Sequence, residues 1–253
     1  MRQNIALAKW RRNEPSVGAW LSLNNIHAAE LLAHAGFDWV VLDMQHGLLE
    51  YGDLLRMLPA ISTTETTPFV RVASNNLPEI NKALDAGAMG IIVPLVNTPE
   101  QCAAAVSACR YPPDGTRSFG PTRAALYGGA GYAAEANGQI ACIAMVETRE
   151  ALDNLEAIVA TPGLSAVYVG PADLALSLGL NPRADTEDPK HIAACEKIVA
   201  ACKQQRVPVG IHTGGLAWSR RRLAMGFDFV TLGSDAGFMM QAATADLAAI
   251  RAG

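Results

Sequence analysis

Long apolar runs and clusters of basic residues are both missing from this sequence of 253 residues. No apolar segment approaches the ~18 residues that a membrane-spanning helix needs, and residues 1–15 lack the apolar core of a secretory signal. The one basic run, Arg220–Arg222, falls in a helical pattern and is typical of a solvated helix face. With a net charge of −4, the chain has no basic footprint for nucleic acid. We therefore expect neither a membrane nor a nucleic acid as partner.

Paired cysteine motifs are missing as well. The five cysteines form no C-x-x-C, and their odd number argues against a closed set of disulfides. Cys102 and Cys109 lie seven residues apart in one helical pattern, and Cys195 and Cys202 do so in another, which places each pair on one helix face. These thiols are predicted to be buried, reduced packing groups, which indicates a cytoplasmic protein.

Eight short apolar runs are spread along the chain, and most are followed by an amphipathic helical pattern. Such runs predict strands buried on both faces, as in a parallel sheet. Eight strand–helix units without a linker predict a single-domain (β/α)8 TIM barrel over residues 1–253. A doubly wound sheet is the competing fold, but no G-x-G-x-x-G follows the first strand.

The element boundaries can be read from these patterns. Strands are expected at Val17–Leu23, Trp39–Leu42, Phe69–Val72, Gly90–Val93, Ala141–Val146, Ala166–Val169, Pro208–Ile211 and Phe229–Leu232. Helices are expected at Ala28–Ala35, Gly52–Ile61, Pro78–Ala86, Pro99–Cys109, Arg149–Val159, Pro189–Gln205, Leu216–Ala224 and Phe238–Arg251. Residues 1–15 would add a short helix over one end of the barrel, and Leu174–Leu178 another short helix.

Two of the apolar runs end abruptly in a carboxylate. Glu147 follows the fifth run, and Asp173 follows the sixth across a Gly-Pro-Ala turn. In a barrel both would lie on the rim formed by the carboxyl ends of the strands, where barrel enzymes carry their active sites. Two hard oxygen ligands there could hold a divalent cation, with water and substrate completing its shell. For either residue alone, a helix-capping role is an equal alternative.

Further polar residues are predicted on the same rim. They are Asp43, Gln45 and His46 after the second run, Arg71 at the end of the third, and His212 at the end of the seventh. No lysine ends any of the eight runs, which counts against an aldolase that works through a Schiff base. The glycine-rich turns at Thr213–Gly215 and Gly233–Ser234 are candidates for binding a phosphate group, so a phosphorylated substrate stays an open alternative.

This set of residues suits enolate chemistry on a 2-keto acid. A divalent cation on Glu147 and Asp173 would chelate the keto acid and acidify its C3 proton, and all-oxygen ligation favours Mg²⁺ or Mn²⁺, with Co²⁺ or Ni²⁺ as substitutes. Arg71 would donate to the developing enolate oxygen. His46 is the candidate for acid–base catalysis, because histidine is the side-chain type that usually serves this role.

Supporting roles follow from position. Asp43, three residues before His46, would orient its imidazole ring, although a capping or rim carboxylate is as good an explanation. Backbone N–H groups after Gly170 would seat the substrate carboxylate. A rim salt bridge is the alternative role for Arg71.

An ordered set of motifs from about residue 17 to the C-terminus resembles the class II, metal-dependent 2-keto-acid aldolases. That family is typified by 4-hydroxy-2-oxoheptanedioate aldolase and 2-dehydro-3-deoxyglucarate aldolase. The matching stretches are Gly-Ala-Trp20-Leu, Val-Leu-Asp43-Met-Gln-His46, Val-Arg71-Val, Leu-Asp85-Ala-Gly-Ala, Val-Pro94-Leu-Val, Tyr111-Pro-Pro-x-Gly-x-Arg117, Glu147-Thr-Arg-Glu-Ala and Gly170-Pro-Ala-Asp173-Leu.

The resemblance implies reversible aldol cleavage of 4-hydroxy-2-keto acids to pyruvate and an aldehyde, through an enolate held at the metal. It also implies a homohexamer, a trimer of dimers, whose C-terminal helices are often exchanged. The resemblance assigns Glu147 and Asp173 to the metal, His46 to the role of base and Arg71 to the keto oxygen. It implies that Asp43 and a neighbouring subunit's Asp85 support His46. It places Gly170, Ala172 and Asp173 at the substrate carboxylate, and Trp20, Pro94, Val96 and His212 around the aldehyde.

Two departures from the family pattern bear on the substrate. Gln45 stands where many members have Glu, which lowers the charge beside His46 and resembles the branch that accepts hydroxypyruvate as well as pyruvate. His212 stands where other members carry apolar residues, which would alter the choice of aldehyde. Two alternative functions stay open: an acyl-CoA thioester lyase of the related barrels, and a non-catalytic barrel that binds keto acids.

Overall fold

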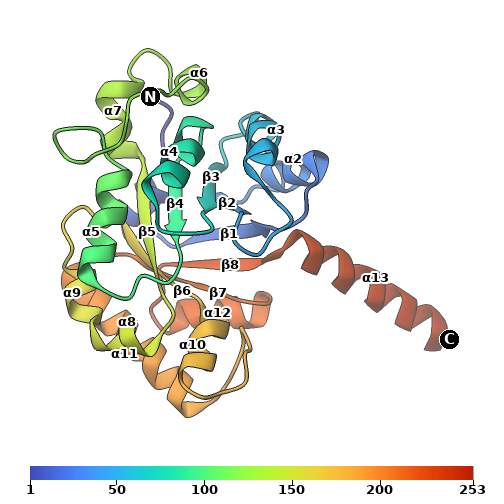
Figure 1. Cartoon of the computed structure of the whole chain (residues 1–253). Helices are drawn as coiled ribbons and strands as arrows, with labels where there is room; N and C mark the ends of the chain where they lie inside the picture. Colours follow the sequence, from blue (N-terminus) through green and yellow to red (C-terminus); the bar gives the residue numbers. More distant parts are fainter. Residues whose placement is uncertain (253) are drawn as a thin grey trace.

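All eight expected apolar runs form strands in the computed structural model, which describes residues 1–252. The strands are parallel, pair in sequence order and close into a barrel, with β8 beside β1 (Figure 1). Their bounds are β1 (Ser16–Leu21), β2 (Trp39–Asp43), β3 (Thr67–Arg71), β4 (Gly90–Val93), β5 (Ala141–Val146), β6 (Ala166–Val169), β7 (Val209–His212) and β8 (Phe229–Ser234). The predicted (β/α)8 barrel is confirmed, because each strand returns to its neighbour through helical connections.

The helices surround this barrel (Figure 1). They are α1 (Ile5–Arg11), α2 (Ile26–His34), α3 (Tyr51–Ile61), α4 (Leu77–Asp85), α5 (Pro99–Ala108), α6 (Ala124–Gly128), α7 (Tyr132–Gln139), α8 (Arg149–Asp153), α9 (Leu155–Val159), α10 (Pro171–Ser177), α11 (Pro189–Gln205), α12 (Leu216–Ala224) and α13 (Asp235–Ala252). The single helix expected over 149–159 is interrupted at Asn154. The sequence pattern also missed α6 and α7, whose glycine- and alanine-rich residues carry no clear apolar period.

Aromatic side chains fill the inside of the barrel. Trp39 packs on Phe69 with ring centroids 5.8 Å apart, and Phe229 lies 5.9 Å from Trp39. Gly18 makes room for this layer, because a Cβ there would approach the Trp39 ring to 2.2 Å. Trp10 of α1 closes the amino-terminal end by packing against Phe229 with tilted rings whose centroids lie 4.4 Å apart. The predicted N-terminal helix over one end of the barrel is therefore confirmed.

The basic run on α12 differs from its prediction in part. Arg220 and Arg221 are exposed, but Arg222 is fully buried. Its guanidinium lies 5.4 Å from the Trp218 ring and donates to the sulfur of Met225. The expectation of a fully solvated arginine face was therefore wrong, because the third position of the run faces the inside of the helix layer.

Two other expectations concern what the chain does not form. The five cysteines are free and buried, as predicted for packing thiols. Among residues 1–252, no helix combines the length and apolar character needed to cross a bilayer.

The C-terminal helix α13 projects away from the barrel (Figure 1). Asp235 at its start is buried and accepts hydrogen bonds from the backbone N–H groups of Ser22 and Leu23. Beyond that root the helix is largely exposed, including Met240 and Ile250, which are 63 % and 80 % accessible. Large apolar side chains are therefore exposed along this projecting helix.

Candidate active site

A cavity of about 180 Å³ opens at the carboxyl ends of the strands, and most of the predicted site residues line it. These are Trp20, His46, Arg71, Glu147, Gly170, Ala172, Asp173 and His212. Met145, Tyr168, Pro171 and Ala184 complete the wall and were not singled out from the sequence. Met145 and Tyr168 could have been found from their positions on β5 and β6, and Pro171 from its place in the Gly-Pro turn.

Glu147 is the deepest carboxylate of the cavity, at 1 % exposure. Its Oε1 accepts the backbone N–H of Leu95 at 2.8 Å, whereas Oε2 is buried without a hydrogen-bond partner among the described residues. Burial raises the pKa of Glu147 to about 7, and the charge of Asp173 adds to this. The helix-cap alternative for Glu147 is wrong, because the side chain of Thr148 caps α8 by accepting the N–H of Ala151 at 3.0 Å.

The Gly170 turn brings Asp173 to this carboxylate. Gly170 is the residue that precedes α10, and Asp173 lies exposed in the first turn of that helix. A Cβ on Gly170 would come within 2.0 Å of Glu147 Oε2, so any larger residue would displace the carboxylate. The turn therefore keeps Gly170 close to the unpaired oxygen of Glu147, in a cavity that Asp173 also lines.

Leu95 supplies the N–H that anchors Glu147, and it does so from the left-handed region, with φ of 52°. A non-glycine residue is costly there and persists only when its surroundings fix it. Pro94 and Val96 are buried on either side of it, and the Val96 N–H bonds the carbonyl of Met145 at 3.2 Å. These two residues shape the turn under the site. They are not among the residues lining the cavity, where the aldehyde was expected to meet them.

Arg71 reaches the cavity from the end of β3 in a bidentate ion pair. Its Nε and Nη2 donate to the two oxygens of Asp43 at 2.8 and 2.6 Å, and the Trp20 Nε1–H donates to the same carboxylate at 3.0 Å. Burial acts to raise the pKa of Asp43, but Arg71 and Trp20 outweigh it and lower that pKa. The guanidinium also lies 4.9 Å from the Trp20 ring centroid. Arg71 is thus held in one orientation with a permanent charge.

Asp43 serves His46 differently from the prediction. Its Oδ1 accepts the backbone N–H groups of Gln45 and His46 at 3.0 and 3.3 Å. The side chains in residues 1–252 that donate hydrogen bonds to Asp43 are those of Arg71 and Trp20. The prediction that Asp43 orients the His46 ring is therefore wrong for this chain. The carboxylate instead fixes the loop that carries the exposed His46. The buried Oε1 of Gln45, in the same loop, has no hydrogen-bond partner in the described part of the chain.

His212 and Trp20 form the other wall. Their rings meet edge to face at 5.1 Å, and Trp20 stacks on Tyr168 at 5.6 Å. Burial lowers the pKa of His212 to about 4, and the charge of Arg71 adds to this. His212 is therefore neutral at physiological pH.

Comparison with known proteins agrees with this geometry. The model of the HpcH/HpaI aldolase/citrate lyase family matches residues 16–242. The chain belongs to that family. It is 42 % identical to a hydroxypyruvate/pyruvate aldolase of Rhizorhabdus wittichii, across 96 % of this chain and 97 % of that one. It is 39 % identical to the 2-dehydro-3,6-dideoxy-6-sulfogluconate aldolase of Pseudomonas putida, across 95 % and 94 %.

A solved structure of the HpcH/HpaI family gives the same result for the fold. The crystal structure of a family protein from Burkholderia cenocepacia superposes with a TM-score of 0.92 at 38 % identity, covering 98 % of this chain and all of that one. The expectation of a carbon–carbon lyase of the aldolase type on a single-domain barrel is confirmed.

Asp85 is another predicted residue of this HpcH/HpaI aldolase that does not line the cavity of its own chain. Asp85 accepts from Arg117 Nη2 at 2.8 Å, and burial raises the pKa of Asp85 despite that ion pair. Arg117 is almost fully buried and also donates to the Tyr132 hydroxyl at 3.0 Å. Support of His46 by Asp85 of a neighbouring subunit stays a prediction.

Proposed function

We propose that this HpcH/HpaI family member is a divalent-metal-dependent aldolase that reversibly cleaves 4-hydroxy-2-keto acids to pyruvate, or hydroxypyruvate, and an aldehyde. One observation carries the proposal. Glu147, whose buried Oε2 has no hydrogen-bond partner among the described residues, lines one cavity together with Asp173, Arg71 and His46. The hydroxypyruvate/pyruvate aldolase activity named for the Rhizorhabdus relative supports the choice of keto acid.

The residues present fit a hard divalent cation such as Mg²⁺ or Mn²⁺, with Co²⁺ as a substitute. Carboxylate oxygens are preferred ligands of these ions. A buried carboxylate oxygen without a donor is costly, and a cation would satisfy it. In residues 1–252 no group of three or more histidine, cysteine or acidic side chains converges, so water and substrate would complete the shell of an ion on Glu147 and Asp173. When bound, the ion would act as the Lewis acid that acidifies the C3 proton of the keto acid.

Arg71 is the fixed donor for the keto oxygen. Because both oxygens of Asp43 hold it, the guanidinium loses little freedom when substrate arrives. Its charge is present before and after proton removal, so it stabilises the enolate oxygen more than the neutral ketone.

His46 is the proposed base. It lies in the cavity on the loop fixed by Asp43 and has one side open to solvent, through which a proton can leave. In the cleavage direction it takes the proton of the C4 hydroxyl while the C3–C4 bond breaks, which gives the aldehyde and the enolate, and a proton then adds to C3 of the enolate to give the free keto acid. In the addition direction C3 first loses that proton, and His46 returns a proton to the new alkoxide. Gln45 beside it adds no charge, in contrast to the glutamate of many relatives.

The remaining walls select the two ends of the substrate. Backbone groups at Gly170, Ala172 and Asp173 are proposed to hold the keto-acid carboxylate, because N–H groups in the first turn of a helix are free to bind anions. Trp20 and the neutral His212 present an aromatic wall to the aldehyde, and the imidazole of His212 supplies the hydrogen-bonding group of that wall. Such a wall accepts aldehydes that carry a hydroxyl group.

Assembly and compartment are proposed along with the activity. The exposed apolar residues of α13 support an exchanged C-terminal helix in a homo-oligomer, with a hexamer as the expected form. Reduced, buried cysteines support a cytoplasmic location.

The test is retro-aldol cleavage followed as pyruvate release from a panel of 4-hydroxy-2-keto acids, with Mn²⁺ present. His46→Ala and Glu147→Gln should abolish turnover while circular dichroism stays native. Glu150→Gln, an exposed change three residues along, is the matched control and should keep full activity. Full activity of His46→Ala would overturn the base assignment. Tight binding of coenzyme A without aldol turnover would favour the thioester lyase instead, and tight binding of a keto acid without any turnover would favour a binding protein.

A further inference from the structure

A second pocket lies at the opposite end of the barrel from the active site. Its wall includes Ile140, Ser165 and Pro208, which directly precede β5, β6 and β7, so it opens at the amino-terminal end of the sheet. The cavity measures about 220 Å³, and the α1 residues Leu7 and Trp10 contribute an apolar side.

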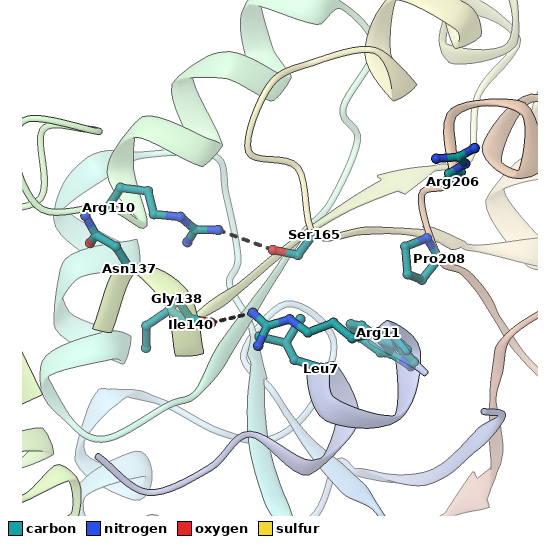
Figure 2. A pocket seen from close by; sticks show the side chains of 10 residues that line it. Leu7, Arg11, Arg110, Asn137, Gly138, Ile140, Ser165, Arg206 and Pro208 are labelled. Carbon is teal, nitrogen blue, oxygen red and sulfur yellow. Dashed lines mark hydrogen bonds between the residues drawn. The ribbon is translucent and has the colours of Figure 1, made fainter. Parts of the chain in front are cut away.

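Three arginines line this space and none of its lining residues is acidic. Arg11 comes from the end of α1, Arg110 from the segment after α5, and Arg206 from the end of α11. Figure 2 shows Arg110 and Arg11 extending into the space from opposite sides, with Arg206 near Pro208 beyond them. Arg11 donates only to the carbonyl of Gly138, at 2.6 Å, among the described residues.

Arg110 is the strongest sign of a missing negative charge. It is 8 % exposed, and its partners are the carbonyls of Cys109 and Gly163 and the hydroxyl of Ser165, at 3.2 to 3.4 Å. All of these acceptors are neutral. A nearly buried cation held only by long hydrogen bonds to neutral groups is unusual, because burial of a charge without a counter-charge is costly.

Three carboxylates at this end of the barrel are already engaged with other cations. Ion pairs join Glu14 to Arg12, Asp38 to Lys9 and Asp228 to Lys203. A fourth carboxylate, that of Asp114, accepts a hydrogen bond at 2.9 Å from the side-chain amide of Asn137, which lies at the edge of the pocket. The three arginines therefore keep an uncompensated positive field over an open cavity, which concentrates anions.

We propose that this pocket binds a small anion with two negative charges, of the phosphate or dicarboxylate class, between Arg11, Arg110 and Arg206. The Ser165 hydroxyl lies beside Arg110 as a further hydrogen-bonding group. Guanidinium forks suit the paired oxygens of either class. The pocket is independent of the aldolase site, and its occupant is a ligand rather than a substrate.

Isothermal titration with inorganic phosphate, and separately with succinate, tests the proposal at constant ionic strength set with chloride. Wild-type protein should bind at least one of the two, and the two arms distinguish a phosphate site from a dicarboxylate site. Arg11→Gln combined with Arg206→Gln changes two exposed side chains and should weaken that binding by on the order of tenfold or more, because two charge-assisted contacts are lost. Arg220→Gln, an exposed arginine on α12, is the matched control and should bind as wild type.

Three results would overturn the proposal: binding of neither anion by the wild type, equal binding by the double variant, or equal weakening in Arg220→Gln. Retro-aldol turnover of the double variant should match the wild type, because both arginines lie at the end of the barrel away from the catalytic cavity. Failure of the anion site thus leaves the proposed aldolase untouched, and loss of the aldolase activity does not affect the anion titration.

Discussion

Replacing Glu147 by glutamine should change the pH dependence of folding stability in a way that added metal largely offsets. Glutamine keeps an oxygen for the Leu95 N–H and removes the buried charge. The pKa of Glu147 rises from its ordinary 4.5 to about 7 on folding. Because each pKa unit corresponds to ~1.4 kcal/mol, the ionised carboxylate costs the metal-free fold about 3 kcal/mol.

The sign follows from which state releases the proton first. Between pH 4.5 and about 7 the unfolded chain is already ionised at Glu147, while the folded metal-free protein still holds the proton. The folded state binds more protons in this window, so its stability falls as pH rises and levels off above pH 7. Glutamine has no such titration. The difference in unfolding free energy between variant and wild type should therefore move by about 3 kcal/mol, in favour of the variant, from pH 4.5 to pH 8.

Urea unfolding in EDTA, measured for both proteins across this pH range, gives the difference directly, since other titrating groups cancel. With Mn²⁺ at 100 times its dissociation constant, the wild type alone should gain about 2.7 kcal/mol, and the order of stability at pH 8 should shift back toward the wild type. Parallel pH curves for the two proteins in EDTA would refute the account of Glu147 as a buried, destabilised carboxylate.

Three further predictions follow from the same contacts. The apparent affinity for Mn²⁺ should fall about tenfold from pH 8 to pH 6 in calorimetric titrations, since the ion displaces the Glu147 proton, and a flat profile would contradict this. Arg71→Lys should lower kcat/KM by roughly 10²–10³, because lysine cannot match both oxygens of Asp43, whereas the exposed Arg149→Lys should not. Removal of residues 239–253 should reduce the number of chains per particle, calculated from the mass in light scattering, and an unchanged number would exclude α13 as an assembly element.

The sequence predicted the location of the catalytic cavity well because barrel geometry is periodic. Glu147, Asp173, Arg71 and His46 each follow a buried strand, and strands of a parallel barrel all end on one rim. The roles proposed for these residues rest on that placement. The metal itself, and the support of His46 by Asp85 from a second subunit, stay predictions.

What the sequence could not show depends on register and on backbone turns. Asp43 and Arg71 are direct neighbours in the pairing of β2 with β3, and this register sets their ion pair. Sequence distance favoured His46, only three residues away, as the partner of Asp43. Leu95 likewise left no signal, since its contribution is a backbone N–H presented by a left-handed turn. Arg222 was misjudged because three consecutive arginines on a helix point in three directions.

Proton exchange on pyruvate tests the central claim most directly, because it needs no knowledge of the aldehyde. The protein is incubated with pyruvate in D₂O, with Mn²⁺ or with EDTA, and the methyl proton signal is followed by NMR. The account predicts loss of the signal with Mn²⁺, retention of the signal in EDTA, and retention in Glu147→Gln under both conditions. A metal-loaded wild-type protein that exchanges neither pyruvate nor hydroxypyruvate would contradict enolate formation at this site.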